Sequence, residues 1–269
     1  MNSTLTVIIP TLNNTFGLKY LLNYFKDKPY QLIVVDNKPT SKKLESLKVG
    51  KFESLIYLPQ KKNQGFAGAV NLGAKYAKTK WLLILNDDIE FEDDQSINRL
   101  YMEAEKRKVE ALSPTLKNPN GEVENYGYRV LPHGKVELVK KLESFKVKKL
   151  DGLTAACLLI KANVFRKLKG FDESFFAYLE DVEFFLRFKK AGYKMGITTD
   201  IEFLHNHMTT TKTMGSFKAK QDMINWGRLY FKHKEMFKFD LKFIIERLRN
   251  LSGYLKTVFN KDSLCNLLK

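Results

Sequence analysis

Residues 81–88 read Trp-Leu-Leu-Ile-Leu-Asn-Asp-Asp, an uninterrupted apolar run that ends in two adjacent carboxylates. Such a run is typical of a strand buried on both faces of a parallel sheet. In these sheets, ligands bind beyond the carboxyl ends of the strands. Because Asp87 and Asp88 would repel each other, we expect a divalent cation with oxygen ligands at this position. Asp88 is the first candidate ligand, and the alternative is a solvated acidic turn, which we expect for Glu92-Asp93-Asp94.

The chain on both sides of this stretch alternates short strands with helices. Before it, we predict strands over 5–9, 32–35 and 54–58, and helices over 16–25 and 66–77. After it, we predict a helix over 96–108, a strand over 109–112, a helix over 180–191, and two short strands over 195–197 and 201–204. Residues 122–139 are either a hairpin or a loop over the site. This alternation predicts an α/β fold with a parallel sheet covered on both faces.

Other predicted strands also end in polar residues. The first ends in Pro10-Thr11-Leu12-Asn13 and the second in Asp36-Asn37. A carboxylate there suits a ribose hydroxyl or a base edge, although Asp and Asn also form turns. Residues 63–71 open a helix with two glycines, and its N-terminus would offer N–H groups to a phosphate. The alternative is an ordinary helix entry with small residues for close packing.

Acids and histidines in the second half of the chain complete the candidate set. Glu180 and Asp181 follow an aromatic run and open a helix. They either cap that helix or supply a general base, since a partly buried carboxylate is more basic. His205 and His207 follow the last predicted strand, and one of them is a candidate to complete a metal site with Asp88.

Composition and charge narrow the class of partner. The chain has 46 Lys and Arg against 30 Asp and Glu, a net charge of +16, which favours anionic partners. Its two cysteines form no disulfide framework, and no segment reads as a signal peptide or a transmembrane helix, so we expect a reducing, cytoplasmic setting. We expect two parts, a catalytic domain over 1–207 and a basic helical extension over 208–269. Residues 238–261 keep a helical apolar period flanked by basic residues, which suits contact with an anionic membrane on its inner face, or packing on the chain's own domain or in a homodimer.

These motifs, together with Gly170-Phe171-Asp172-Glu173 ahead of Glu180, stand in an order that resembles one family. The chain resembles the inverting family 2 glycosyltransferases of the GT-A fold, in the rhamnosyltransferase-like branch, over roughly residues 5–207. The resemblance implies an α/β GT-A fold, with a mixed, mostly parallel central sheet, followed by the C-terminal helical extension.

The resemblance also implies roles for individual residues. Asp181, beside Glu180, would be the catalytic base, and Asp88 with His205 would hold Mn²⁺ or Mg²⁺, with His207 as the fallback. The nucleotide sugar would contact Pro10, Thr11, Asn13, Asp36, Asn37, Asn63, Gly65, Asn71, Asn86 and Asp87.

The implied activity is transfer of a hexosyl unit from a nucleoside-diphosphate donor, dTDP-rhamnose or a UDP-sugar, to a glycan or lipid-linked acceptor in bacterial surface polysaccharide synthesis. A sugar-nucleotide pyrophosphorylase is a rival, but it would need a glycine-rich basic loop where Thr11-Leu12-Asn13-Asn14 stands. A nucleic-acid-binding protein and a non-catalytic scaffold are further alternatives. The acidic clusters argue against nucleic acid, and the intact set of acids argues against a scaffold.

Overall fold

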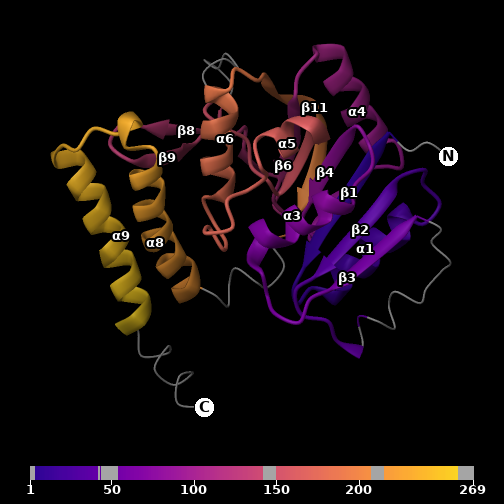
Figure 1. Ribbon diagram of the computed structural model, residues 1–269, viewed down its shortest axis with the longest axis horizontal. Helices are drawn as coiled ribbons and strands as arrows, with labels where there is room; N and C mark the ends of the chain where they lie inside the picture. The colour runs from indigo at the N-terminus through magenta and orange to yellow at the C-terminus, as the bar shows by residue number, and fades with distance from the viewer. Residues whose placement is uncertain (1–3, 42, 44–53, 142–149, 207–214, 260–269) are drawn as a thin grey trace.

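The centre of the molecule is a nine-stranded mixed sheet (Figure 1). The computed structural model describes residues 4–41, 43, 54–141, 150–206 and 215–259. The strand order is β3-β2-β1-β4-β10-β6-β11-β5, with β7 paired to β6. Strands β10, β5 and β7 run against the other six, so the expected mixed and mostly parallel sheet is confirmed.

The first half of the chain builds the parallel part of the sheet. Its elements are β1 (Leu5–Thr11), α1 (Thr15–Phe25), β2 (Gln31–Asp36), β3 (Leu55–Pro59), α3 (Gly65–Tyr76) and β4 (Trp81–Leu85). All five side chains of β4 are buried because neighbouring strands and helices cover both its edges and both its faces. The apolar run over 81–85 is therefore a central strand, as predicted.

The second half of the chain adds strands both in the middle of the sheet and at one edge. Its elements are β5 (Ile89–Phe91), α4 (Ser96–Arg107), β6 (Ala111–Lys117), β7 (Val123–Asn125), β10 (Cys157–Lys161), α5 (Ala162–Lys167), α6 (Glu180–Lys190) and β11 (Met195–His205). Strand β10 lies antiparallel between β4 and β6. The two short strands predicted over 195–204 are a single strand, β11, with a shift of register between Thr198 and Glu202.

Strand β6 is longer than predicted because it continues through Pro114. A proline lacks the N–H that a ladder needs, so prolines inside sheets stand where one side of a strand is unpaired. The pairing of β6 with β10 ends at Leu112, while β11 pairs with β6 on its other side through Pro114. The missing N–H is therefore tolerated.

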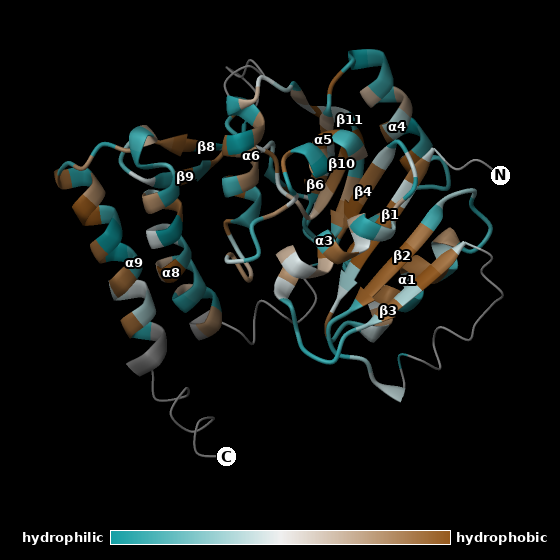
Figure 2. Ribbon diagram, in the orientation of Figure 1, coloured by the Kyte–Doolittle hydropathy of each residue, from teal (hydrophilic) through white to brown (hydrophobic). Residues whose placement is uncertain are grey.

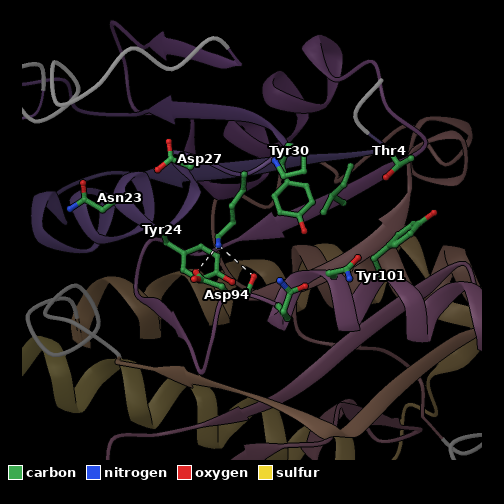
Figure 3. Close-up of a pocket in the computed structure, with 12 residues that line it drawn as sticks. Thr4, Asn23, Tyr24, Asp27, Tyr30, Asp94 and Tyr101 are labelled. Carbon is green, nitrogen blue, oxygen red and sulfur yellow. Dashed lines mark hydrogen bonds and ion pairs between the residues drawn. The ribbon is translucent and has the colours of Figure 1, made fainter. Parts of the chain in front are cut away.

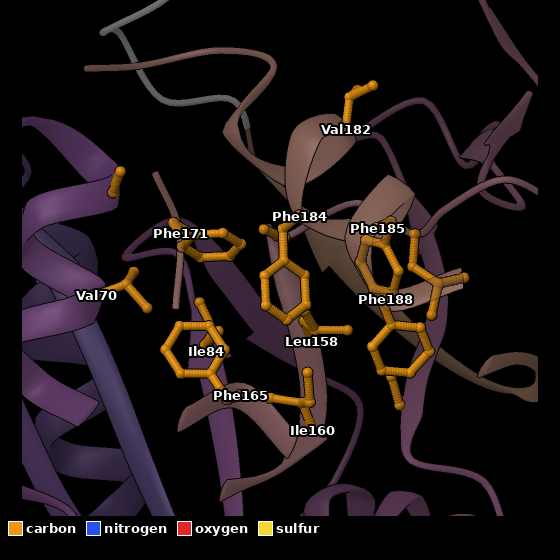
Figure 4. Packing of buried hydrophobic residues seen from close by; sticks show 14 of the residues in the cluster. Val70, Ile84, Leu158, Ile160, Phe165, Phe171, Val182, Phe184, Phe185 and Phe188 are labelled. Carbon is orange, nitrogen blue, oxygen red and sulfur yellow. The ribbon is translucent and has the colours of Figure 1, made fainter. Parts of the chain in front are cut away.

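Helices cover both faces of the sheet, and each layer buries its own cluster. One cluster joins α1 and α4 to the sheet through residues such as Leu21 and Leu100. The other joins α3, α5 and α6 to the opposite face. Figure 4 shows its phenylalanines packed beside Ile84, Leu158 and Ile160, with their rings edge-on or tilted to one another: Phe165, Phe171, Phe184, Phe185 and Phe188. The sheet is thus fixed from both sides, which holds its strand ends in place.

A hairpin and two long helices extend this second cluster. The hairpin alternative for 122–139 is confirmed by β8 (Tyr128–Leu131) and β9 (Lys135–Leu138). Helices α8 (Gly215–Lys232) and α9 (Leu241–Phe259) follow, with a short 3₁₀ turn, η2 (Lys234–Met236), between them. Trp226, Leu229 and Phe243 from these helices join the cluster that contains α6. No helix in the described ranges is long and apolar enough to cross a membrane.

Candidate active site

The acidic tip of β4 is hydrogen-bonded to two other segments. The backbone N–H of Asn86 donates to the carbonyl of Ala156, just before β10, at 2.8 Å. The side chain of Asn14 caps helix α1 and donates to the Asp87 carbonyl at 2.9 Å. Burial, together with the charge of Asp88, raises the pKa of Asp87 to about 7. The structure therefore holds the tip between the segment before β10 and the start of α1.

Asp88 faces a histidine from the end of β11. His205 Nε2 lies 3.2 Å from Asp88 Oδ1, and His205 Nδ1 lies 3.0 Å from Glu124 Oε2 on β7. The backbone of Asn206 donates to the Asp88 carbonyl at 2.9 Å, which holds the two strand ends together. Burial alone would lower the pKa of His205, but the carboxylates of Asp88 and Glu124 raise it to about 9. Of the two candidate histidines, His205 is in place, and His207 lies outside the described residues.

Asp88 and His205 are placed so that both could bind one divalent cation. Asp88 Oδ1 is buried and accepts no hydrogen bond from the described residues, although His205 Nε2 is near. Two ligands at right angles on one ion, each about 2.1 Å from it, would be about 3 Å apart, close to the observed separation. Glu124 behind the ring matches the carboxylate–histidine pairs that orient metal-bound imidazoles. Within the described ranges, no group of three or more His, Cys, Asp or Glu side chains could hold a metal ion.

The second pair of acids stands at the start of α6. Tyr178 and Leu179 just before it have positive φ values of 68° and 66°, an unfavourable conformation for side chains of this size. The buried Asn225 of α8 holds this turn, because its Nδ2 donates to the carbonyls of Ala177 (2.8 Å) and Tyr178 (2.7 Å). Asn225, a residue of the C-terminal helices, therefore fixes the turn from which α6 starts, and with it the positions of Glu180 and Asp181.

Glu180 and Asp181 differ in their surroundings. Asp181 accepts hydrogen bonds from the backbone of Val182 (2.8 Å) and of Ala155 (3.4 Å), and burial raises its pKa to about 6. Burial and the charge of Asp181 raise the pKa of Glu180 well above its usual range. Burial thus makes both carboxyl groups more basic, and the backbone hydrogen bonds to Asp181 favour its charged form.

The ends of β1 and β2 are anchored by a lysine that no sequence motif marks. Asp36 is fully buried, and its carboxylate accepts from Lys43 Nζ (2.7 Å), the Tyr57 hydroxyl (2.7 Å) and the Lys38 backbone (2.9 Å). Lys43 also donates to the Leu12 carbonyl at 2.6 Å. Asp36 thus holds the loops after both strands rather than turning a free oxygen to a ligand.

The other residues predicted at the ends of β1 and β2 are either buried or bonded within the protein, with one exception. Pro10 and Thr11 are buried in β1, and Asn13 is exposed beyond it. Asn37 accepts from the backbone of Gln64 (3.1 Å) and donates to the Gly65 carbonyl (3.1 Å). Only Asn13 therefore stands open to solvent.

The entry of helix α3 is closed by the protein itself. The Asn63 side chain accepts from the Gly65 N–H at 2.9 Å, and the Phe66 N–H donates to the Phe176 carbonyl at 2.9 Å. Gly65 has a φ of 72°, and a Cβ there would lie 2.0 Å from the Phe176 oxygen. Position 65 therefore requires glycine, because any side chain would collide with the Phe176 carbonyl. At least two N–H groups of this turn are unavailable to a phosphate, so close packing explains this part of the motif.

Asn71 of α3 is also occupied within the protein. Both ends of its amide bind the backbone of Phe171, at 2.8 Å and 2.9 Å, and its Nδ2 also donates to Glu173 at 3.0 Å. It joins α3 to the loop before α6, so its contribution to the site is to position that loop.

Hollows in the surface lie at both ends of the sheet. A small crevice beside the acidic tip is lined by Asn14, Asp87, Asp88, Glu90 and Asn206, among others. A larger cavity of about 750 Å³ lies near the amino end of β1, where Figure 3 shows Tyr24 and Tyr30 beside the Lys28–Asp94 ion pair and Thr4 and Tyr101 on the far side. Because the paired acids lie at the carboxyl ends, the larger cavity is not part of the candidate site.

Comparison with known proteins identifies the family. Residues 6–169 match the model described as glycosyl transferase family 2. A low-salt glycan biosynthesis hexosyltransferase, Agl10, from Haloferax volcanii is 25% identical over 236 residues, which are 84% of this chain and 75% of that protein. An N-acetylglucosaminyl-diphospho-decaprenol L-rhamnosyltransferase from Mycobacterium tuberculosis is 25% identical over 221 residues, 71% of each chain.

Solved structures share the fold. A mannosyltransferase from Pyrobaculum calidifontis, in complex with GDP-Man and Mn²⁺, superposes with a TM-score of 0.64 at 15% identity and covers all of this chain and 79% of its own. TarS 1–349 of S. aureus in complex with UDP gives a TM-score of 0.58 at 16% identity, over 95% of this chain and 81% of that one. The predicted GT-A-like fold is confirmed, and the pyrophosphorylase and nucleic-acid alternatives are set aside. With the family model matching more than half of its length, this chain belongs to glycosyl transferase family 2 and is a glycosyltransferase of glycan biosynthesis.

Proposed function

We propose that this glycosyltransferase moves a sugar from a nucleoside-diphosphate donor to an acceptor hydroxyl with inversion at the anomeric carbon. One observation carries the proposal: the segment just before β10 is hydrogen-bonded both to Asp181 and to Asn86, the first residue of the acidic tip. Its Ala155 N–H donates to Asp181, and its Ala156 carbonyl accepts from Asn86, two residues before Asp88. These two contacts to neighbouring residues support a site in which the proposed base and the proposed cation-binding tip act on one substrate, as an in-line displacement requires.

Asp181 is the proposed base, and Glu180 is its neighbour at the start of α6. The Asp181 carboxylate takes the proton from the acceptor hydroxyl while the hydroxyl oxygen attacks the anomeric carbon. The bond from this carbon to the diphosphate oxygen breaks, the diphosphate leaves with the electron pair, and attack from the opposite face inverts the configuration. Burial raises the pKa of Asp181 to about 6, so this carboxylate is more basic than an exposed one and is still ionised at neutral pH.

Asp88 and His205 are the residues that would hold Mn²⁺ or Mg²⁺, with Glu124 orienting the imidazole. A bound cation would neutralise charge on the departing diphosphate. Asn86 and Asp87 complete the tip, and Thr11 and Asn13 at the end of β1 are the proposed nucleotide contacts on the neighbouring strand. Asp36, Asn37, Asn63, Gly65 and Asn71 support the same site by holding the loops around it.

The relatives guide the choice of donor and acceptor. The mycobacterial relative is named for rhamnosyl transfer to a decaprenol-linked sugar, and the solved neighbours hold GDP-Man or UDP. We therefore propose dTDP-rhamnose and UDP-sugars as the first donors to test, and a glycan on a lipid carrier as the acceptor class. The proposed catalytic part spans 1–207 and the helical extension 208–269.

A thermal-shift screen tests the proposed donor site. Nucleotide sugars are added with and without Mn²⁺ or Mg²⁺, since a ligand that binds the folded state raises the melting temperature. We expect one nucleotide class to stabilise the protein, and the cation to add to the shift. Asp88→Asn should remove the cation-dependent part, whereas Asp94→Asn, at an 82% exposed side chain, should retain it. A cation-dependent shift that persists in Asp88→Asn would refute the proposed role of Asp88.

A further inference from the structure

Helix α9 turns its apolar side away from the protein. Its exposed apolar residues are Leu241, Ile244, Ile245, Leu248, Leu251 and Leu255, between 39% and 71% exposed. At about 100° per residue, these six lie within an arc of about 120°, a continuous stripe along the helix. Figure 2 shows hydrophobic residues along α9 at the edge of the molecule. An amphipathic helix normally buries such a stripe, so this one is available to a partner.

The opposite side of α9 is fixed in place, which prevents the stripe from rolling inward. Phe243 is 5% exposed and belongs to the hydrophobic cluster that contains α3, α5 and α6. The Arg247 guanidinium lies over the Trp226 ring of α8, 4.1 Å from its centroid, and donates to the Gly134 carbonyl at the hairpin tip. The Lys238 N–H donates to the Pro132 carbonyl at 2.7 Å. The orientation of the stripe is therefore a property of the fold.

Basic side chains follow one edge of the stripe. Lys242, Arg249 and Lys256 are exposed, and their positions on the helical wheel fall within an arc of about 40° beside the leucines. The acid Glu246 points inward, with 15% of its side chain exposed, and pairs with Arg249 at 2.6 Å. The outer face of α9 thus combines apolar residues with positive charge.

We propose that α9 is the surface by which this protein lies on an anionic lipid bilayer, with the leucine stripe in the headgroup–acyl boundary and the basic edge at the phosphates. Apolar insertion and attraction to anionic lipid add together in such helices. The contact proposed here is peripheral, because it is made by the outer face of a helix that lies on the bilayer surface. The binding surface is separate from the paired acids, so it stands whether or not the proposed reaction is correct.

A second copy of the chain fits this face less well. Nineteen residues make a helix about 28 Å long, and a stripe about 10 Å wide covers roughly 300 Å², well below the ~800 Å² per partner of a stable interface. A two-fold contact would also bring the two basic edges together, whereas anionic headgroups neutralise them. Area and charge therefore both favour lipid.

Vesicle flotation of the full-length protein tests the proposal. We expect binding to phosphatidylcholine vesicles that contain phosphatidylglycerol, weak binding to phosphatidylcholine alone, and weaker binding at high salt. Leu248→Gln/Leu255→Gln should reduce the partition coefficient roughly tenfold or more, and Lys242→Gln/Lys256→Gln roughly fivefold for each lysine removed. Both pairs lie on the surface, so the melting temperature should be retained.

Matched controls lie on α4, which is also a surface helix. Met102→Gln, at a 59% exposed residue, and Lys106→Gln, at an 80% exposed side chain, should bind vesicles as the unaltered protein does. Equal binding of the α9 variants and these controls would overturn the proposal. So would a lipid-free dimer that Leu248→Gln/Leu255→Gln converts to a monomer without changing vesicle binding, because the stripe would then be a protein interface.

Discussion

The turn that positions the proposed base depends on Asn225, one residue of α8. Replacing Asn225 by Ala removes two hydrogen bonds, to the carbonyls of Ala177 and Tyr178, and the acceptor of an Arg228 N–H. Each bond contributes about 1 kcal/mol, and carbonyls left without a donor in a partly buried place add a desolvation cost, so the free energy of unfolding should fall by about 2–4 kcal/mol. The two positive φ values before Glu180 cost about 1–3 kcal/mol each, and this turn should relax when the side chain that holds it is removed.

The effect on catalysis separates this reasoning from a general loss of stability. A relaxed turn displaces Asp181, and we expect kcat to fall roughly ten- to hundredfold while the KM for the donor changes little. Urea unfolding gives the stability, and release of nucleoside diphosphate from the donor found by thermal screening gives the rate. Asn98→Ala, at an exposed position of α4, is the control and should stay within about 0.5 kcal/mol of the unaltered protein. If Asn225→Ala is as stable and as fast as Asn98→Ala, the turn does not depend on this side chain.

Three other predictions concern single groups. Asp181→Asn should lower kcat by about 10²- to 10⁴-fold and leave the nucleotide-dependent thermal shift intact; retained activity would show that another group takes the proton. Lys43→Met leaves the buried Asp36 without its cation and should lower the free energy of unfolding in urea by about 3–5 kcal/mol. The double variant Lys43→Met/Asp36→Asn should recover part of this loss. Unchanged stability of Lys43→Met would contradict the burial of this ion pair. Burial raises the pKa of Asp181 to about 6 and of Asp87 to about 7 from an ordinary 3.8. Each raised pKa stabilises the folded state fully below the ordinary value, and this contribution is lost as pH rises to the folded values of about 6 and 7, so the ligand-free protein should lose stability between about pH 4 and 7. Asp87→Asn should flatten that loss, and an unchanged slope in urea unfolding would count against the raised pKa of Asp87.

The ends of strands and the starts of helices are where the sequence alone locates the proposed chemical groups. Asp88 and Asp181 can be found in this way because buried strands and helix starts have local patterns, and such patterns depend on neighbours in the chain. The same patterns do not separate ligand-facing side chains from those that hold loops. Asn71 resembles a pocket residue, yet its amide is occupied by a segment 100 residues away.

Residues that the sequence patterns do not mark act through distant partners. Lys43 is one of many lysines in a basic chain, and only its pairing with the buried Asp36 distinguishes it. Glu124 lies in a stretch that the sequence assigns either to a hairpin or to a loop, and its contact with His205 crosses 81 positions of sequence. Asn14 has a usable local signal, since an Asn just before a helix is a favoured N-cap, but its second bond to Asp87 depends on the sheet.

The place of β10 in the sheet sets an order for biosynthesis. Residues 157–161 fill the gap between β4 and β6, strands that leave the ribosome much earlier. Until that segment emerges, the edge of β4 that it covers is unpaired, and β6 has no strand through which to join the sheet. Pairings so far apart in sequence form slowly, and exposed edges attract other chains. A truncation before residue 157 should therefore aggregate rather than fold as a smaller enzyme, and chaperone occupancy on translating ribosomes should decline only after β10 has been released.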